Sequence, residues 1–479
     1  MRAFGAVDIG NSGLRVMLGT LDQDRLALRE VTRVPNAPVL LADGWHWDAV
    51  GLVETTVAGL AEADAITPLD AIAVDTWGVD YGLLDEQGRL LGPPFSYRDE
   101  RSLPMVAVAR ERIGAADLYA LTGCQDMPIN SVYQLLADDI AGRLDAAACF
   151  LLMDDLVHHR LSGVIGADET NASTTGLFNP TTRDWSWTAI EAVRLPDRLF
   201  APVQRTGAVL GESLPGSNLR PGIPIVTAAG HDTAAAWVAG ADMEDALVVS
   251  LGTWSLVGVE LNAPLVTEAG RLANFTNEIG VLGTIRFLRN AAGMWILQEC
   301  LREWREMEPD LTWAHVIAEA ERCQPFAHLI DPDNTVFMAP GPMASRVATA
   351  GEGRKPTERG PVVRAVLESL ALSHRWLLES AQSVLGRRLT SIRIVGGGSQ
   401  NRALCQMMAD ATGLPVVAGP VEATALGNVA MQAIALGAID SLEEAREMLR
   451  ASYPQERFQP STSTEWEAAY RRWRDLANR

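Results

Sequence analysis

At 479 residues the chain is longer than one hydrophobic core usually grows, so two domains are expected. The formal net charge of −20 argues against a nucleic-acid-binding surface and favours a small-molecule substrate. Five scattered cysteines, an acid within the first apolar run and the absence of any run of eighteen apolar residues predict a cytoplasmic protein without a membrane span.

The first half of the chain opens with a predicted β-meander followed by a helix and another strand. Apolar residues 4–10 and 14–21 are typical of two strands, and Asn11 to Gly13 of the tight turn between them. The remaining predicted elements are a strand at 26–34, a helix at 48–63 and a strand at 71–75.

The opening pattern returns halfway along the chain. Residues 246–252 predict a strand and residues 256–260 a second one, joined by the turn that begins at Thr253. When Asp8 is placed on Ser250, 242 residues later, the strand and the glycine turn align without a gap. An internal duplication explains this simply, although such hairpins are common. It predicts domains at 1–242 and 243–479.

The rest of the second half alternates helices with strands. Helices are predicted at 291–305, 312–322, 361–385, 401–412 and 423–436, and strands at 391–395 and 415–418. Such alternation predicts an α/β fold with a mostly parallel sheet and helices on its faces.

Glycine turns supply the candidate phosphate sites. The turn after Asp8 and the turn at Gly252 and Thr253 expose backbone amides that could hold one triphosphate, although each alone reads equally well as an ordinary hairpin turn. The sole lysine, Lys355, lies outside any GxxxxGK[ST] pattern, which excludes a P-loop. The turn at residues 396–401 lacks the last glycine of a dinucleotide fingerprint, and it fits an adenine or α-phosphate contact as well.

Asp232 is the candidate catalytic carboxylate. It follows the apolar strand 224–228 and precedes a helix of small residues, so it lies at the edge of a sheet where α/β proteins bind ligands. A helix cap is the structural alternative. A second polar segment, residues 75–82, suits a polyol, although Trp77 reads equally well as a core residue.

Taken together, these segments resemble the FGGY family of carbohydrate kinases. The resemblance spans nearly the whole chain and is carried by residues 75–85, 97–99, 130–137, 172–175, 231–233 (His-Asp-Thr), 251–255 (Leu-Gly-Thr-Trp-Ser), 274–278, 283–290, 297–300, 395–401 (Val-Gly-Gly-Gly-Ser-Gln-Asn) and 419–427. It implies an actin-like (ribonuclease H-like) α/β ATPase fold, with two duplicated domains around a central cleft where ATP and a sugar meet.

The resemblance also implies a role for individual residues. It makes Asp232 the general base and Asp8 the residue that holds Mg²⁺ through water. Around the sugar it places Gly78, His231, Thr233 and Asn290, and near the nucleotide Asn11, Ser12, Gly13, Leu14, Arg15, Thr253, Gln298 and Gly398. The implied partners are ATP and a small sugar, without nucleic acid or membrane, and the implied state is a monomer or homodimer.

Two segments depart from the usual motifs of the family, and the substrate stays open. The first loop reads Asp-Ile-Gly-Asn-Ser-Gly-Leu-Arg where the most similar members usually read Asp-x-Gly-Ala-Ser-Ser-Gly-Arg, and Asp154 stands where proline is usual. The implied acceptor is the primary hydroxyl of a ketose such as L-rhamnulose, or of L-fuculose or L-xylulose instead. The motifs also allow an actin-like ATPase without sugar kinase activity or a non-catalytic sugar sensor, although the acids Asp8 and Asp232 argue against the sensor.

Overall fold

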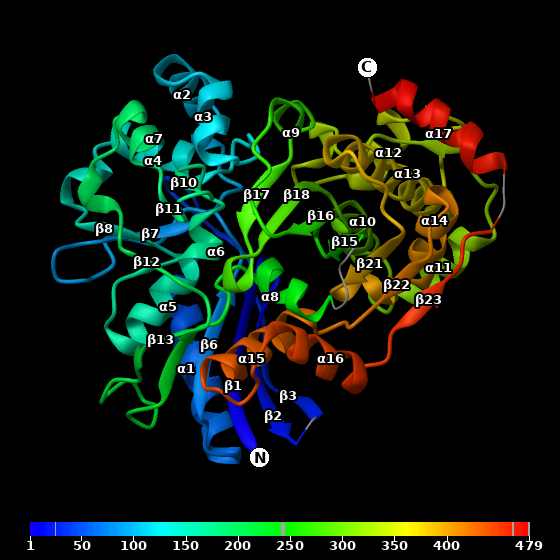
Figure 1. Ribbon diagram of the computed structural model, residues 1–479. Helices are drawn as coiled ribbons and strands as arrows, with labels where there is room; N and C mark the ends of the chain where they lie inside the picture. Colours follow the sequence, from blue (N-terminus) through cyan, green and yellow to red (C-terminus); the bar gives the residue numbers. More distant parts are fainter. Residues whose placement is uncertain (24, 241–244, 462–463, 478–479) are drawn as a thin grey trace. The chain divides into compact units, whose positions relative to one another are not determined.

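The computed structural model describes residues 1–23, 25–240, 245–461 and 464–477 (Figure 1). The chain forms two compact units: unit 1 comprises Met1–Ala241, Glu260–Leu288 and Glu422–Tyr453, and unit 2 comprises Asp242–Val259, Arg289–Val421 and Pro454–Arg479. Unit 1 therefore includes two segments from the second half of the chain. The predicted domain boundary after residue 242 lies outside the described residues, and the division into domains 1–242 and 243–479 stays a prediction.

The core of unit 1 is a six-stranded sheet with the order β13-β14-β6-β1-β2-β3. Its strands are β1 (Arg2–Gly10), β2 (Gly13–Asp22), β3 (Arg25–Pro35), β6 (Ala71–Thr76), β13 (Ala208–Glu212) and β14 (Pro224–Thr227). β1 runs antiparallel to β2 and parallel to β6. Every residue of β1 from Ala3 to Ile9 is buried, as expected for a central strand that is covered on both faces, whereas β3 at the edge is largely exposed. The predicted strands of the first half are confirmed.

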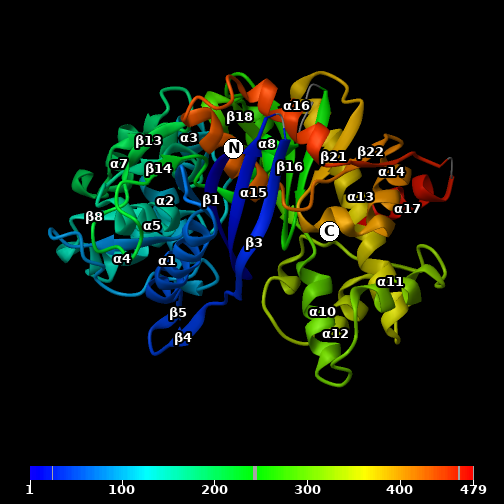
Figure 2. The ribbon, with the colours of Figure 1, turned by 90° about the horizontal axis from the view of Figure 1, so that it is seen from below.

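Helices α1 (Ala49–Ile66) and α15 (Ala423–Ala435) cover opposite faces of this sheet. Val16 on β2 lies against Gly59 of α1, whereas Gly19 lies against Val429 of α15. Side chains alternate between the two faces along a strand, so these positions point to opposite sides. Figures 1 and 2 show α15 beside β1 although the two are more than 400 residues apart in sequence.

The other elements of unit 1 surround this core. Its further helices are α2 (Met105–Arg112), α3 (Ala115–Thr122), α4 (Ser131–Ile140), α5 (Met153–Ser162), α6 (Glu169–Ala172), α7 (Trp187–Val193), α8 (Asp232–Ala239), α9 (Glu268–Leu272) and α16 (Leu442–Ser452). Short strands pair as β4 (Val39–Leu41) with β5 (Gly44–His46), β7 (Tyr81–Leu84) with β8 (Cys149–Leu152), β9 (Ala167–Asp168) with β12 (Val203–Gln204), and β10 (Phe178–Asn179) with β11 (Asp184–Trp185).

A second sheet has the order β17-β18-β16-β15-β21-β22-β23. Its strands are β15 (Ala246–Leu251), β16 (Trp254–Leu261), β17 (Thr276–Ile279), β18 (Ile285–Ala292), β21 (Ser391–Val395), β22 (Val416–Ala418) and β23 (Glu456–Phe458). β15 pairs antiparallel with β16 and parallel with β21, as β1 does with β2 and β6. The prediction of a mostly parallel sheet is wrong, because the hairpin strands and β23 pair antiparallel.

The helices of unit 2 are α10 (Trp295–Arg305), α11 (Trp313–Glu321), α12 (Met343–Ala350), α13 (Arg359–Leu385), α14 (Arg402–Thr412) and α17 (Thr464–Ala477), and β19 (His328–Leu329) pairs with β20 (Glu352–Gly353) (Figure 2). The helix predicted from residue 291 begins only at Trp295, because the chain is still in β18 up to Ala292. None of the described helices combines the length and the apolar character needed to cross a membrane.

Candidate functional site

Three carboxylates gather at one edge of the unit 1 sheet. Asp8 on β1 is in register with Asp75 on the parallel neighbour β6, and Asp232 begins α8, the helix that follows β14. Burial raises the pKa of the Asp8 carboxyl to about 6, and the charges of Asp232 and Glu422 act in the same direction. Burial also raises the pKa of the Asp75 carboxyl well above its usual range, helped by the charge of Asp8. The three acids therefore repel one another electrostatically and together attract a cation.

Arg15 places a positive charge beside Asp8. It lies across the ladder from Asp8, and its Nη2 is 3.1 Å from Asp8 Oδ2. Its Nη1 pairs with Glu422, which directly precedes α15. The guanidinium, whose side chain is 28% exposed, is thus held at the site by two carboxylates and remains within reach of an anion.

The two residues that flank Asp232 in sequence hold its carboxylate in place. His231 Nδ1 lies 2.8 Å from Asp232 Oδ1, to which Thr233 Oγ1 also donates at 3.0 Å. Burial alone would raise the pKa of the Asp232 carboxyl, but the hydrogen bond and charge of His231 lower the pKa below its ordinary value. The carboxylate is therefore ionised at neutral pH.

Two further charged residues, Glu278 and Arg286, lie behind His231. His231 Nε2 lies 3.9 Å from Glu278 Oε2 on β17, and Glu278 pairs with Arg286 Nη2 on β18 at 3.0 Å. The Arg286 side chain is 0% exposed and Glu278 4%, whereas Asp232 is 28% exposed. Asp232 is therefore the accessible member of this row of side chains. A substrate can reach its carboxylate, while His231, Glu278 and Arg286 fix its position from behind.

The turn before Asp232 is tied to the sheet and to α6. Asn171 Nδ2 donates to the carbonyl oxygen of Gly230 at 2.9 Å, and the same carbonyl accepts from Thr76 N at 2.7 Å. The backbone N–H of His231 donates to Thr170 Oγ1 at 2.9 Å. A Cβ atom on Gly230 would lie 1.9 Å from Asp154 Oδ2, so only glycine fits here. The backbone that carries Asp232 is therefore rigidly placed.

Gly78 lies in a second constrained segment. The next residue, Val79, has a φ of 70°, which is rare for a β-branched side chain. Thr174 Oγ1 accepts from Val79 N at 3.1 Å, and Ser131 Oγ donates to Val79 O at 2.6 Å. Surrounding bonds thus hold a strained conformation, as is common at ligand sites.

Trp77 belongs to the core, as one of its two interpretations predicted. Its side chain is 3% exposed, and its Nε1 donates to Asp80 Oδ2 at 2.9 Å. Asp80 also accepts from Trp47 Nε1 at 2.6 Å and Gln134 Nε2 at 3.0 Å. Trp77 therefore supports the Gly78 segment from behind and offers no exposed aromatic face.

The turn from Asn11 to Gly13 joins β1 to β2 in unit 1. Asn36 supports it, since its side chain donates to Gly10 O at 2.9 Å and its backbone N–H to Ser12 O at 3.2 Å. Leu14 is 0% exposed and lies in β2, so its side chain belongs to the core. The turn and the carboxylate cluster thus share the end of β1.

Three predicted nucleotide residues meet in unit 2 at the end of β15. Thr253 Oγ1 donates to Gln298 Oε1 on α10 at 3.2 Å. A Cβ atom on Gly398 would lie 2.3 Å from Leu251 Cγ, so the glycine turn after β21 closely approaches the end of β15. Asn290 lies on β18 in the same unit.

The residues around Asp8 fit a divalent cation. Asp75 Oδ1 is buried and accepts no hydrogen bond from the described residues, so this pair of acids retains a free oxygen. Carboxylate oxygens are the ligands that Mg²⁺ prefers, and it keeps several waters of its own. An ion held partly through water suits carboxylates that lie on neighbouring strands.

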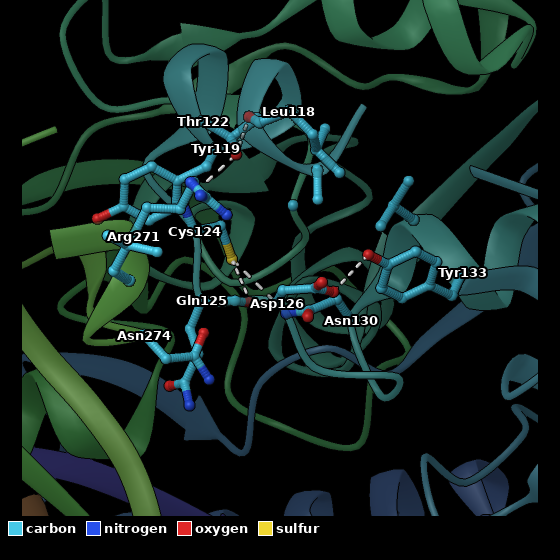
Figure 3. A pocket seen from close by; sticks show the side chains of 14 residues that line it. Leu118, Tyr119, Thr122, Cys124, Gln125, Asp126, Asn130, Tyr133, Arg271 and Asn274 are labelled. Atoms are coloured by element: carbon cyan, nitrogen blue, oxygen red, sulfur yellow. Dashed lines mark hydrogen bonds between the residues drawn. The ribbon is translucent and has the colours of Figure 1, made fainter. Parts of the chain in front are cut away.

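A separate pocket of about 310 Å³ opens in unit 1 between α3, α4 and α9 (Figure 3). Its lining includes Tyr133, whose hydroxyl donates to Asp126 Oδ1 at 2.7 Å, and Asn130, which donates to Thr174 O at 3.0 Å. None of the predicted site residues lines this pocket. Thr174 connects this pocket to the Gly78 segment, because its carbonyl oxygen accepts from Asn130 and its Oγ1 accepts from Val79 N.

Sequence reasoning singled out Asp8 and Asp232, included Asp75 only in the segment 75–82 that suits a polyol, and assigned no site role to Glu278 or Arg286. Asp75 lies at the end of a predicted strand, as Asp8 does. If these two strands were neighbours in a parallel sheet, Asp75 would lie beside Asp8. Glu278 and Arg286 gave no such signal, because their contact with His231 depends on the pairing of β17 with β18.

Comparisons with known proteins agree across the whole chain. The model of the FGGY family of carbohydrate kinases, N-terminal domain, matches residues 4–239, and that of the C-terminal domain matches residues 247–436. A rhamnulokinase of Bacteroides thetaiotaomicron is 36% identical over 98% of both chains. A rhamnulokinase of Pectobacterium atrosepticum is 38% identical over 98% of this chain and 96% of its own length.

Solved structures share the fold at low sequence identity. A xylulose kinase from Rhodospirillum rubrum has a TM-score of 0.78 and 19% identity, covering 100% of this chain and 98% of its own. A Plasmodium falciparum glycerol kinase with ADP has a TM-score of 0.79 and 15% identity over the same shares of the two chains. The predicted actin-like α/β fold with two domains is confirmed.

Proposed function

Because the chain belongs to the FGGY family of carbohydrate kinases, we propose that it transfers the γ-phosphoryl group of ATP to L-rhamnulose and forms L-rhamnulose 1-phosphate. Family membership makes it an ATP-dependent sugar kinase. The choice of sugar is supported by the rhamnulokinases of 35–38% identity that cover at least 96% of their own length.

One observation carries the proposed chemistry: Asp232 is an ionised, partly exposed carboxylate on a rigid turn. It is 28% exposed, and His231 and Thr233 hold the same oxygen, Oδ1, which leaves Oδ2 for a substrate hydroxyl. A general base must be both reachable and unprotonated at working pH. Asp232 meets both conditions.

In the proposed reaction Asp232 accepts the proton of the primary hydroxyl as its oxygen attacks the γ-phosphorus in line with the departing ADP. The lowered pKa of Asp232 suits a late proton transfer, because the hydroxyl becomes acidic only as its bond to phosphorus forms. His231 keeps Asp232 in one orientation, and Glu278 with Arg286 keeps His231 in place. Gly78, His231, Thr233 and Asn290 are proposed to surround the sugar.

The nucleotide residues are proposed in two sets. Asn11, Ser12, Gly13, Leu14, Arg15 and Thr253 are assigned to the phosphates, and Gln298 and Gly398 to the rest of ATP. Asp8 would hold Mg²⁺ through water, where the ion would neutralise negative charge on the phosphate oxygens. Domains 1–242 and 243–479 would thus contribute the sugar site with the first phosphate loop and the nucleotide site, respectively. The proposed enzyme works in the cytoplasm, where ATP is available, as a monomer or homodimer.

A panel of ketoses tests the proposal. Purified protein with ATP and Mg²⁺ is given L-rhamnulose, L-fuculose, L-xylulose or D-fructose, and ADP release is measured beside product phosphate position by NMR. We expect the highest kcat/KM for L-rhamnulose and phosphate on O1. A higher kcat/KM for another ketose overturns the sugar assignment, and ADP release that no sugar increases overturns the kinase assignment.

A further inference from the structure

A second acidic cluster lies inside unit 1 and has no role in the proposed reaction. Asp154 and Asp155 are in the first turn of α5, and His158 follows on the same helix. Residues three and four apart share a helix face, so His158 lies over both acids. One oxygen of each acid and one ring nitrogen of His158 all lie within 4.8 Å of one another.

This cluster is buried and lacks a balancing positive charge among the groups that act on it. Asp154 is 0% exposed, Asp155 4% and His158 1%. The charged neighbour of both acids is a further acid, Asp168, and burial together with that charge raises the pKa of the Asp154 and Asp155 carboxyls well above their usual range. Unpaired buried carboxylates are costly unless a proton or a metal ion neutralises them.

Several atoms of the cluster lack hydrogen-bond partners among the described residues. Asp154 Oδ2, both ring nitrogens of His158 and Asp168 Oδ2 are buried in this way. Buried polar atoms of a folded protein nearly always have a partner. The other oxygens have donors: Asp154 Oδ1 accepts from Asn171 Nδ2 at 2.6 Å, and the Asp168 backbone N–H donates to Asp155 Oδ1 at 3.0 Å and to Asp155 Oδ2 at 3.3 Å.

We propose that Asp154, Asp155 and His158 form a binding site for one divalent transition-metal cation, with Zn²⁺ as the expected ion. Two carboxylates balance the charge of one such ion, and a set of two carboxylates and one imidazole suits zinc. The ligand atoms lie within 4.8 Å of one another, so small side-chain rotations that draw them together would let them share an ion at about 2.0–2.2 Å from each ligand. The site is separate from the Mg²⁺ proposed at Asp8.

The ion would stabilise the turn that carries the catalytic carboxylate. Asn171 Nδ2 bridges Asp154 Oδ1 and the carbonyl oxygen of Gly230, two residues before Asp232. Neutralising the acids next to Gly230 would hold this bridge in one arrangement.

Metal content tests the proposal directly. The buried ligands would acquire the ion during folding and exchange it slowly, so untagged protein is expressed with Zn²⁺ and Mn²⁺ in the medium. The purified protein is passed through a chelating resin and analysed by mass spectrometry of its metals. We expect about one Zn²⁺ per chain, as for a structural site. Protein without a stoichiometric transition metal overturns the proposal.

Three variants identify the ligands. Asp154→Asn and His158→Gln are expected to lower bound zinc at least about tenfold. Asp154→Pro, which introduces the residue usual in the family at a position where a helix tolerates it, keeps the test valid if the amide variant does not fold. His328→Gln, at a histidine that is also buried but bonds to Val347 O, is the matched control and retains the metal. Equal zinc in all four variants contradicts the site.

Discussion

The hairpins β1–β2 and β15–β16 occupy the same position in two similar sheets but carry different chemistry. Asp8 on β1 lies between Arg15 on β2 and Asp75 on β6. The aligned residue Ser250 lies between Leu256 on β16 and Val395 on β21. The repeated backbone thus supplies two glycine turns, whereas the charged groups that suit a cation and a reacting phosphate belong to the first copy alone.

The two hairpins also differ in the length of their turns. Asp8 pairs with Arg15, seven residues later, whereas Ser250 pairs with Leu256, six residues later. Shifting a strand by one residue moves its side chains to the opposite face. The second copy therefore has no counterpart of the Asp8–Arg15 pair, and its gapless alignment with the first ends at the turn.

The largest expected effect concerns the carboxylate next to the first hairpin. Asp232→Asn keeps the side-chain shape but removes the base, so kcat should fall about 10²- to 10⁴-fold in an ATP-dependent sugar phosphorylation assay. Asp70→Asn, at an acid in a partly exposed ion pair with Arg2, is the control and should keep wild-type kcat. Wild-type kcat for Asp232→Asn in folded protein would rule out its role as base.

The comparison between hairpins is tested by substituting the aligned residues. Asp8→Asn removes a charge from the proposed metal site and should lower kcat about 10²-fold, with a higher Mg²⁺ requirement. Ser250→Ala removes only a hydroxyl and should change kcat and the KM for ATP less than about tenfold. Both variants are measured in titrations with ATP and Mg²⁺. Equal losses of kcat in Asp8→Asn and Ser250→Ala would contradict a special role for the charge at position 8.

A third prediction concerns the buried chain behind His231. Glu278→Gln leaves the fully buried Arg286 without its charge partner and should lower the free energy of unfolding by about 3 kcal/mol. Glu268→Gln breaks a surface pair with Arg271, in which Glu268 is 64% exposed, and should leave the free energy of unfolding nearly unchanged. Urea denaturation measures both. Similar small losses would mean that Arg286 is stabilised without Glu278.

The smallest expected effect is on pH dependence. His231 lowers the pKa of Asp232, so His231→Phe should raise it and move the acid limb of kcat/KM to higher pH. The free energy of unfolding should also fall at acid pH. The part of it contributed by ionised Asp232 is present above the unfolded pKa of this group and is lost as pH falls through its lower folded pKa. Thr233→Val should move the limb less, in the same direction. If the acid limb of kcat/KM stays at the same pH in both variants, the limb reports the ionisation of a group other than Asp232.

Much of the fold was predictable because its elements have strong local signals. β1, β2, β6 and β15 are apolar runs bounded by glycine turns, and α13 and α14 have clear helical periodicity. The start of α10 was placed four residues early, because Ala291 and Ala292 suit either a helix or a strand and only the pairing of β18 decides. The mixed direction of the second sheet depended likewise on pairing between distant segments.

The sequence by itself determined which residue types are available and where: an acid at the end of a strand, a His-Asp-Thr segment before a helix, and two glycine turns half a chain apart. Only the tertiary structure decided that Asp75 stands beside Asp8, that Arg286 lies behind His231, and that Glu422 and α15 join unit 1. The physical reason is that strand register and helix packing act between residues up to hundreds of positions apart, whereas sequence patterns report local conformation and burial.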